Sequence, residues 1–409
     1  MINVPPYPGP KAAGPFIGVN GPSLHANVAR PNVIEQPREA SLPRYINYLA
    51  DTSGCGHWRI IWPEQVINAT GVGVSHSITS MITDHRFYQN VKSVKLQRQA
   101  SDTQKAFVQL LKKFQQEHGF KIIYEVDDVV FSEEIPDYNK FKFAFDSQSI
   151  RDNCVEIINM VDEVTVTCDF MKRLYMDKTE QKNVTVIPNF VPDYWMGYLF
   201  NGRRVAEQFE KNRRKPRILY TGSGAHYDVA NRTGGKDDFT EVRDFVRATV
   251  DKYQWVFVGA FPPTLVDLVK QKKVEFYPWQ NLLKYPKLIA SLNVQLMIAP
   301  LQVNNFNKAK SDIKYIEACI LGIPCLCQNM ETYSNAPDAL KFSSADEFAA
   351  KVESILAWKN RSKYFSNISK LNEIGRKRIL ELDENIGAHI EALNHPCNSP
   401  ERKYLKKWN

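Results

Sequence analysis

The sequence predicts an α/β protein with two parallel-sheet domains, and three observations support this fold class. Apolar segments of strand length alternate with amphipathic helix patterns along most of the chain. The alternation stops between residues 192 and 216, where prolines and basic residues replace it, and then starts again. The 409 residues, 43% of them hydrophobic, are enough to form two cores of ordinary domain size.

A strand, a helix and a second strand form the clearest local pattern. Residues 93–98 have strand character, and Ser101 with Gln104 makes a capping box that predicts a helix start. Apolar side chains then recur with the period of a helix, and Gly119 supplies a left-handed C-cap. They are Phe107, Leu110, Leu111 and Phe114. The apolar segment at residues 122–126 follows at once, as in the repeating unit of a parallel sheet.

The same alternation predicts the other elements. In the first half we expect helices at residues 150–160 and 169–176 and strands at 163–167 and 183–187. In the second half we expect strands at residues 217–220, 255–258, 274–277, 294–298 and 324–327, with helices between them, the first from about Asp237. The sequence from residue 345 is mainly helical.

These patterns define four segments. We expect a first domain at residues 1–195, a basic linker at 196–215 and a second domain at 216–370. Residues 371–409 are expected to form C-terminal helices that pack back on both domains.

The composition excludes several classes of protein. No apolar segment reaches the roughly 18 to 20 residues that cross a bilayer. Residues 1–10 contain four prolines and lack the basic and apolar regions of a signal peptide. Seven cysteines, an odd number with no CxxC pair, predict reduced thiols. We therefore expect a cytoplasmic protein without stable membrane insertion.

The net charge of +8 favours a polyanionic partner or an anionic membrane surface. Part of this charge lies at residues 203–217 and part at residues 401–409. A solvated linker and a solvated chain end also explain both clusters, and we favour that interpretation over a dedicated binding patch.

Two groups of residues follow predicted strands at the edge where ligands bind in open α/β sheets. Asp127 and Asp128 end the strand at 122–126, and one carboxylate can act as a general base. Alternatively, the two acids cap the next segment by accepting backbone N–H bonds. Gly222, Ser223 and Gly224 follow the first strand of the second domain and allow backbone N–H groups to approach a phosphate; a simple tight turn has the same pattern.

A third group lies in the segment FNKAKSDIKYIEACILGIP, at residues 306–324. Ser311 or Asp312 can cap a helix whose amino end points at the crevice, a favourable place for an anion. Lys310, Lys314 and Glu317 have the i, i+4, i+7 spacing of one helix face. The lysines suit a diphosphate, and the carboxylate can accept hydrogen bonds from two ribose hydroxyls. A surface ion pair between Lys314 and Glu317 explains the charges but not their place at the helix start.

The glycine loop, the KSDIKYIEACILGIP helix and the IPNF sequence at residues 187–190 together resemble the nucleotide-sugar-dependent glycosyltransferases of the GT-B type. The resemblance covers about residues 90–360. It implies two facing Rossmann-like domains, with the donor held mainly by the second. Its most specific residues are Lys310, Ser311, Lys314, Glu317, Gly322 and Pro324. Residues 1–90 depart from the usual pattern, because Gly14, Gly18 and Gly21 follow a proline-rich start instead of a strand.

The resemblance also assigns roles. Glu317 would hold the ribose and the two lysines the diphosphate, while Trp279 would contact the nucleobase unless it is a core residue. Asp127 and Asp128, with Arg98 before them, resemble an acidic pair found in a subset of these enzymes, where one carboxylate acts as the base or orients the sugar. His25 and His76, each expected in a loop with small residues, are weaker candidates for the base.

The expected function is transfer of a sugar from a nucleotide-diphosphate donor, preferably UDP-linked, to an acceptor hydroxyl. We expect no metal requirement, because no acidic cluster of the second domain has metal-ligand spacing. A likeness to the sugar transferases of T-even-type bacteriophages, together with the charge, makes hydroxymethylcytosine in double-stranded DNA the preferred acceptor; a phage-encoded enzyme would act in the host cytoplasm. The alternatives are a peripheral enzyme of cell-surface polysaccharide synthesis and a non-catalytic nucleic-acid-binding protein.

Overall fold

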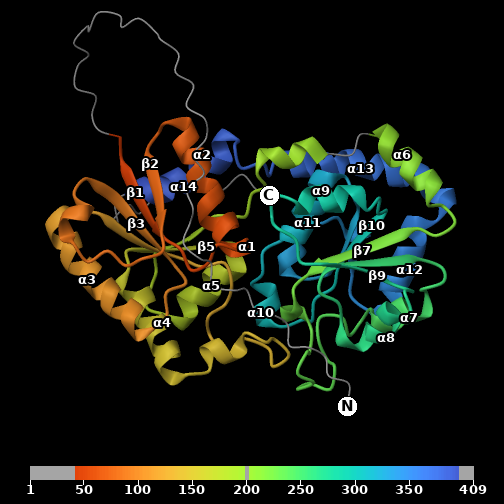
Figure 1. The fold of residues 1–409 in the computed structure, drawn as a ribbon, viewed down its shortest axis with the longest axis horizontal. Helices are drawn as coiled ribbons and strands as arrows, with labels where there is room; N and C mark the ends of the chain where they lie inside the picture. The colour runs from red at the N-terminus through yellow and green to blue at the C-terminus, as the bar shows by residue number, and fades with distance from the viewer. Residues whose placement is uncertain (1–41, 199–201, 396–409) are drawn as a thin grey trace, which may run out of the picture. The chain divides into compact units, whose positions relative to one another are not determined.

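A computed structural model describes residues 42–198 and 202–395 (Figure 1). His25 and the three early glycines lie outside the described residues, as do the last residues of the basic C-terminal end. None of the helices within the described ranges has both the length and the apolar character needed to cross a membrane.

The described residues form two parallel sheets of six strands each. The first sheet has the strand order β2-β1-β3-β4-β5-β6, and each neighbouring pair is parallel. Its strands are β1 (Arg44–Tyr48), β2 (Val74–Ile78), β3 (Val91–Gln97), β4 (Lys121–Glu125), β5 (Glu163–Val166) and β6 (Val184–Val186).

The second sheet has the order β12-β11-β10-β7-β8-β9 and is also parallel. Its strands are β7 (Arg217–Gly222), β8 (Gln254–Gly259), β9 (Glu275–Pro278), β10 (Leu296–Ala299), β11 (Cys325–Gln328) and β12 (Lys341–Phe342). The predicted α/β class with two parallel sheets is therefore confirmed.

Helices connect the strands of each sheet (Figure 1). Those of the first half are α1 (Gly54–Gly56), α2 (Trp62–Thr70), α3 (Asp102–His118), α4 (Gln148–Met160) and α5 (Asp169–Lys178). Those that follow are α6 (Gly202–Lys211), α7 (Arg243–Ala248), α8 (Val266–Lys270), α9 (Tyr285–Ser291), α10 (Asn305–Lys308), α11 (Ile313–Leu321), α12 (Ala345–Leu356), α13 (Arg361–Arg376) and α14 (Asp383–Asn394).

The capping signals around α3 are confirmed. Ser101 accepts a hydrogen bond from the Gln104 N–H, and the Gln104 side chain accepts one from the Ser101 N–H. Gly119 ends the helix with φ of 72°, a left-handed conformation that costs glycine little. Local chemistry alone therefore sets both ends of this helix.

Two expectations about local structure are wrong. The helix expected from about Asp237 begins at Arg243, because the Asp237 carboxylate accepts the Phe239 N–H in a turn before it. The described part of the first half, from residue 42, does begin with a strand and a glycine loop, which are β1 and residues 51–56. In that loop a Cβ on Gly56 would lie 1.9 Å from the Asp51 carbonyl oxygen, so a side chain cannot fit there.

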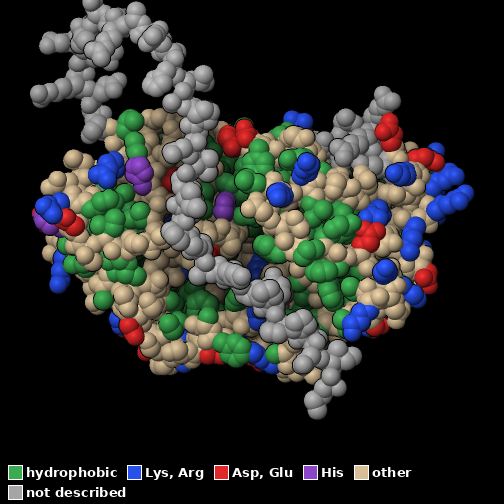
Figure 2. All heavy atoms as spheres, viewed as in Figure 1, with side chains coloured by type: hydrophobic (Ala, Val, Ile, Leu, Met, Phe, Trp, Pro, Cys, Tyr) green, Lys and Arg blue, Asp and Glu red, His purple; other side chains and the backbone are tan. Residues whose placement is uncertain are grey.

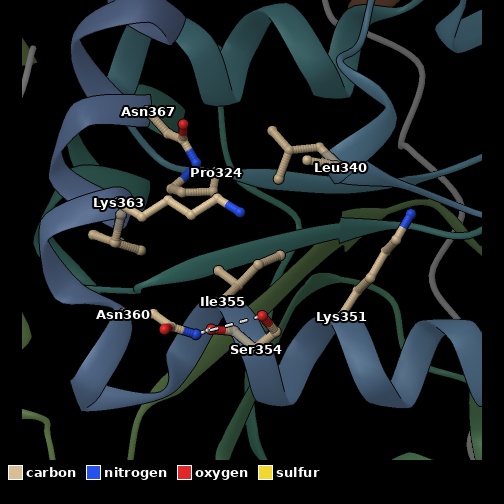
Figure 3. A pocket seen from close by; sticks show the side chains of 10 residues that line it. Pro324, Leu340, Lys351, Ser354, Ile355, Asn360, Lys363 and Asn367 are labelled. Atoms are coloured by element: carbon tan, nitrogen blue, oxygen red, sulfur yellow. Dashed lines mark hydrogen bonds between the residues drawn. The ribbon is translucent and has the colours of Figure 1, made fainter.

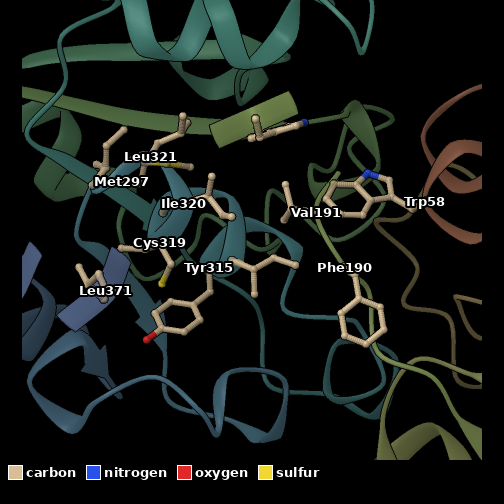
Figure 4. Packing of buried hydrophobic residues seen from close by; sticks show 14 of the residues in the cluster. Trp58, Phe190, Val191, Met297, Tyr315, Cys319, Ile320, Leu321 and Leu371 are labelled. Carbon is tan, nitrogen blue, oxygen red and sulfur yellow. The ribbon is translucent and has the colours of Figure 1, made fainter. Parts of the chain in front are cut away.

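The cores of the two halves are joined by a shared cluster of buried side chains (Figure 4). Trp58 and Phe190 come from the first half, and Tyr315 and Ile320 come from α11 in the second. The last described helix, α14, packs against helix α2 and against strand β3 of the first sheet. There the Tyr45 hydroxyl donates to Asn394 Oδ1 at 2.9 Å.

Candidate functional site

A cavity of about 300 Å³ is lined by residues of both halves. Its volume lies at the lower end of the roughly 300 to 1,000 Å³ typical of small-molecule sites. Of the residues named from the sequence, it contains Asp127, Gly222, Ser223, Trp279, Lys314 and Glu317. The structure therefore brings the glycine loop, the lysine and carboxylate of α11, and one of the paired acids to the same cavity.

The glycine loop closes the carboxyl end of β7. Ser223 Oγ accepts the Ala225 N–H at 3.2 Å and so fixes the turn into the next residues. Gly259, at the end of neighbouring β8, has φ of 94°, and a Cβ there would lie 2.5 Å from the Gly222 carbonyl oxygen. Close backbone approach of these two strand ends leaves the loop's main chain facing the cavity.

Helix α11 begins directly after one of the two expected cap residues. Its N-cap is Asp312, whose side chain makes no capping hydrogen bond, and Ile313 is its first residue. Asp312 instead forms two 3.0 Å bonds with the Arg378 guanidinium. The expected side-chain cap by Ser311 or Asp312 is therefore wrong, because tertiary partners take both side chains.

Lys310 precedes this helix and does not share a helical face with Lys314 and Glu317. Its Nζ lies 3.8 Å from Asp128 Oδ2 and over the Phe306 ring. Lys310 thus connects the segment before α11 to the acidic pair of the first half.

Asn189, in the IPNF sequence, joins the two halves through its side chain. The residue is 1% exposed. Its Nδ2 donates to Ser311 Oγ at 2.9 Å, and its Oδ1 accepts from Arg59 at 3.0 Å. Arg59, fully buried, also donates to Glu125 Oε1 at 2.7 Å. The start of the α11 segment is therefore tied to the first sheet through buried polar groups.

Lys314 contacts a histidine that the sequence analysis did not select. Its Nζ lies 3.3 Å from His226 Nε2, while His226 Nδ1 lies 2.7 Å from Asp238 Oδ2. Burial and the charge of Lys314 lower the pKa of His226 to about 4, so the imidazole is neutral at pH 7. Burial and Lys310 lower the pKa of Lys314 to about 8.

Glu317 lies one turn further along α11 and is only 6% exposed. Its Oε2 accepts a hydrogen bond from the Tyr285 hydroxyl at 3.0 Å. Burial raises the pKa of Glu317 to about 7, against the opposing effects of Tyr285 and Lys314. This carboxyl group is a cavity residue and not a surface acid.

Trp279 is 53% exposed and lines the same cavity. A core position for this tryptophan is therefore excluded. Its indole forms part of the wall near Gly259, the end of β8.

Asp127 lines the cavity from the first half, and Arg98 and Asp51 form a charged cluster with it outside the lining. Arg98 forms a hydrogen-bonded ion pair with Asp51, and its Nε lies 3.7 Å from Asp127 Oδ1. Arg98 has φ of 46°, a conformation that is unusual for a residue with a side chain and often marks a functional site. Cys55 lines the cavity beside Asp127, and burial raises the pKa of its thiol well above the usual range.

Asp128 differs from Asp127. Its Oδ1 accepts the Val129 N–H at 3.0 Å, as expected of an acid that caps the next segment. Its carboxylate also pairs with Lys310. Only Asp127 lines the cavity.

Other candidates lie elsewhere. His76 stands exposed within strand β2 and not in a loop, so the expectation of a loop histidine is wrong.

Within the described ranges, no group of three metal-ligating side chains close enough to share an ion lies in the cavity. A second cavity, at Pro324 and Lys363, has a volume of about 60 Å³, below the size of a nucleotide site (Figure 3).

Sequence reasoning missed His226, Tyr285 and Cys55 as residues of this cavity. His226 follows the glycine loop by two residues, and Cys55 stands between two glycines after an apolar strand, so both had a local signal. Tyr285 had none, because its role depends on the packing of α9 beside α11.

No protein-family model matches the chain, and no curated protein matches it. Solved structures do share its architecture. HepE from Anabaena, in complex with UDP and glucose, is 9% identical with a TM-score of 0.56, covering 86% of this chain and 100% of HepE. Sucrose-phosphate synthase from Thermosynechococcus elongatus is 12% identical with a TM-score of 0.58, covering 86% of this chain and 98% of the synthase.

A third structure, apo OtsA, is 10% identical with a TM-score of 0.54, covering 87% of this chain and 100% of OtsA. The chain therefore has the fold of the GT-B glycosyltransferases, with two parallel sheets in separate halves.

Proposed function

We propose that this chain is a glycosyltransferase that moves a sugar from a nucleotide-diphosphate donor, preferably a UDP-sugar, to an acceptor hydroxyl. The observation that carries the proposal is the placement of Lys314 and Glu317 on one side of α11, facing the cavity that the glycine loop also lines. HepE, which shares the fold, has been solved in complexes with UDP and with UDP-glucose.

Each group of the donor finds a complementary group in the cavity. Lys314 and the N–H groups of the glycine loop suit the diphosphate, because Gly222 and Ser223 line the cavity and Gly224 follows them directly. His226 holds the lysine in position. Glu317 suits the ribose hydroxyls, and Trp279 offers an aromatic surface to the base.

Lys314 can also stabilise the leaving diphosphate, because its positive charge lies where negative charge develops. We therefore propose that transfer needs no divalent metal. If a chelator leaves the transfer rate unchanged, this proposal is supported. If the chelator lowers the transfer rate and added Mg²⁺ restores it, the proposal is refuted.

Asp127 is the proposed base. Its carboxylate lines the cavity opposite Lys314, and Oδ1 is buried without a hydrogen-bond partner among the described residues. Arg98, 3.7 Å away, holds that carboxylate in place. His25, outside the described residues, remains a weaker proposal for the same role.

For the acceptor, hydroxymethylcytosine in double-stranded DNA remains the preferred proposal. The net charge of +8 supports it, and Figure 2 shows more Lys and Arg side chains over the second half than over the first. The same charge suits the anionic lipid of a surface-polysaccharide acceptor, which is the second candidate. A non-catalytic nucleic-acid-binding protein is the third.

A thermal-shift screen of UDP-, GDP- and ADP-linked sugars tests the donor. A ligand at a hundred times its dissociation constant adds about 2.7 kcal/mol to the free energy of unfolding, which is easily measured. Stabilisation by the UDP-linked compounds alone is expected. No stabilisation by any of them would refute the donor proposal.

Transfer assays then separate the acceptors. We expect labelled sugar on hydroxymethylated duplex DNA and none on unmodified DNA. Transfer only to a lipid-linked acceptor would establish the polysaccharide alternative. DNA binding without donor hydrolysis or transfer would establish the binding protein.

A further inference from the structure

Two histidines and a glutamate meet on the first half, away from the donor cavity. His85 opens the short helix that precedes β3, while Glu117 and His118 are the last two residues of α3. One possible ligand atom from each side chain lies within 4.8 Å of the others. Helix α3 runs from the carboxyl end of β3 to the amino end of β4, so this cluster is at the sheet edge opposite Arg98 and Asp127.

Local structure positions the two histidines. Asp84 caps the helix of His85 by accepting the Arg86 N–H at 3.0 Å. The His85 and His118 rings stack with centroids 5.6 Å apart and planes 19° apart. The site is thus partly organised before any ligand binds.

One buried hydrogen-bonding group of this cluster, Nε2 of His118, has no partner among the described residues. His85 Nδ1 lies 3.0 Å from Glu117 Oε1, and that hydrogen bond accounts for two of the three residues. The His118 side chain is only 9% exposed, and its Nε2 has no hydrogen-bond partner among the described residues. Glu117 Oε1, at 3.8 Å, is too far to serve as one. A buried nitrogen without a partner is costly, which points to a missing ligand.

We propose that His85, Glu117 and His118 bind a divalent transition-metal ion, with Zn²⁺ as the best match. Ligands 2.0 to 2.2 Å from a tetrahedral ion lie about 3.3 to 3.5 Å apart. The separations of 3.0 and 3.8 Å from Glu117 to the two histidines bracket that range, and the two histidine nitrogens lie within 4.8 Å of each other. Two imidazoles and a carboxylate select zinc over Mg²⁺ or Ca²⁺, which prefer oxygen ligands.

We expect the bound ion to stabilise the fold and not to act in catalysis. The side chains of His85 and Glu117 are 45% and 54% exposed, so water can complete the coordination. A bound ion would join the segment before β3 to the end of α3, two elements that also meet through one exposed hydrogen bond and through ring contacts of His85 with Phe114 and His118. It takes no part in the chemistry of the donor cavity.

Calorimetric titration of the chelator-stripped full chain with Zn²⁺ tests this inference. We expect a site that His118→Gln, His85→Gln and Glu117→Gln each weaken about 100-fold or more, since even groups that only orient metal ligands contribute about 10- to 100-fold. His395→Gln is the matched control, because His395 pairs with Glu391 at 3.3 Å in the same way but belongs to no such group of three. That variant should bind Zn²⁺ like the wild type.

Thermal unfolding provides a second measurement. Zn²⁺ should raise the melting temperature of the wild type and of His395→Gln, and leave that of His118→Gln unchanged. Equal melting temperatures of the metal-free proteins will show that the variants fold. Equal Zn²⁺ affinity and stoichiometry in wild type and His118→Gln would overturn the proposal, because binding would then belong to thiols or other groups.

Discussion

Lys314 Nζ lies 3.3 Å from Nε2 of His226, inside the cavity that both halves line. The other imidazole nitrogen, Nδ1, donates to Asp238, so Nε2 presents a lone pair to the ammonium group. A neutral histidine therefore positions the lysine without cancelling its charge. The arrangement leaves that charge available to a bound diphosphate.

Replacing this lysine should mainly affect turnover. Lys314→Ala is expected to lower kcat by a factor on the order of 100, because the charge that stabilises the leaving diphosphate is lost. UDP release from the donor, with and without acceptor, measures the effect. Lys308→Ala is the control, since Lys308 pairs with Glu331 outside the cavity. Wild-type kcat in Lys314→Ala would contradict the assignment.

Substitutions of Asp127 and Asp128 should have different effects. Asp127→Asn is expected to abolish transfer and leave donor affinity within about twofold, because Asp127 belongs to the first half and the donor contacts belong to the second. Asp128→Asn should retain transfer, since that side chain caps Val129 and pairs with Lys310. Parallel measurement of transfer and donor affinity distinguishes them. Loss of donor affinity in Asp127→Asn would show that the acid supports the donor site or the fold.

Donor affinity should depend on pH in a bell-shaped manner. As pH rises through about 7, Glu317 ionises and becomes a stronger acceptor for ribose hydroxyls, so affinity increases. As pH rises through about 8, Lys314 loses its proton and affinity falls. The maximum is therefore expected between these values.

Calorimetry with UDP-glucose over pH 6 to 9 tests this profile, because UDP-glucose has no terminal phosphate that titrates near neutral pH. Glu317→Gln should remove the acidic limb and bind more weakly by about 1.5 to 3 kcal/mol at pH 7.5. An unchanged acidic limb in that variant would assign the ionisation to another group.

The buried link through Asn189 should contribute to stability. Asn189→Ala leaves Arg59 and Ser311 each without one buried partner, and we expect it to lower the free energy of unfolding by about 1 to 3 kcal/mol. Denaturant unfolding measures this change. The control is Asn329→Ala, at an exposed asparagine whose side chain bonds only to Ser343 within the described residues; it should change the free energy of unfolding by less than about 0.5 kcal/mol. Equal effects of the two substitutions would refute the structural role of Asn189.

Strand and helix patterns of the sequence predict most of this fold because local chemistry determines them. The capping box of Ser101 and the alternation of apolar segments need no tertiary information. By contrast, the sequence does not single out β1 and its glycine loop, because the earlier Gly14, Gly18 and Gly21 offer a competing glycine pattern, although Tyr45 and Ile46 precede the loop as a strand should. Residue types alone could not reveal that Lys310 lies before the helix, since Asp128 and Arg378 set that geometry from distant parts of the chain.

The same distinction applies to the candidate site. The glycines, the lysines and the carboxylate of α11 are recognisable by their spacing in the sequence. The partners that position them and shift their pKa values are not. Tyr285 reaches Glu317 from 32 residues away, and Asp238 reaches His226 across a turn. Burial causes the largest part of both pKa shifts, and it depends on the complete packing of the cavity.

A crystal structure of the chain with bound UDP tests the central claim most directly. The account predicts the diphosphate at Lys314 and the Gly222–Ser223–Gly224 backbone, the ribose hydroxyls at Glu317, and the base beside Trp279. UDP bound elsewhere on the chain, or in the cavity without contact to Lys314 and Glu317, would contradict it.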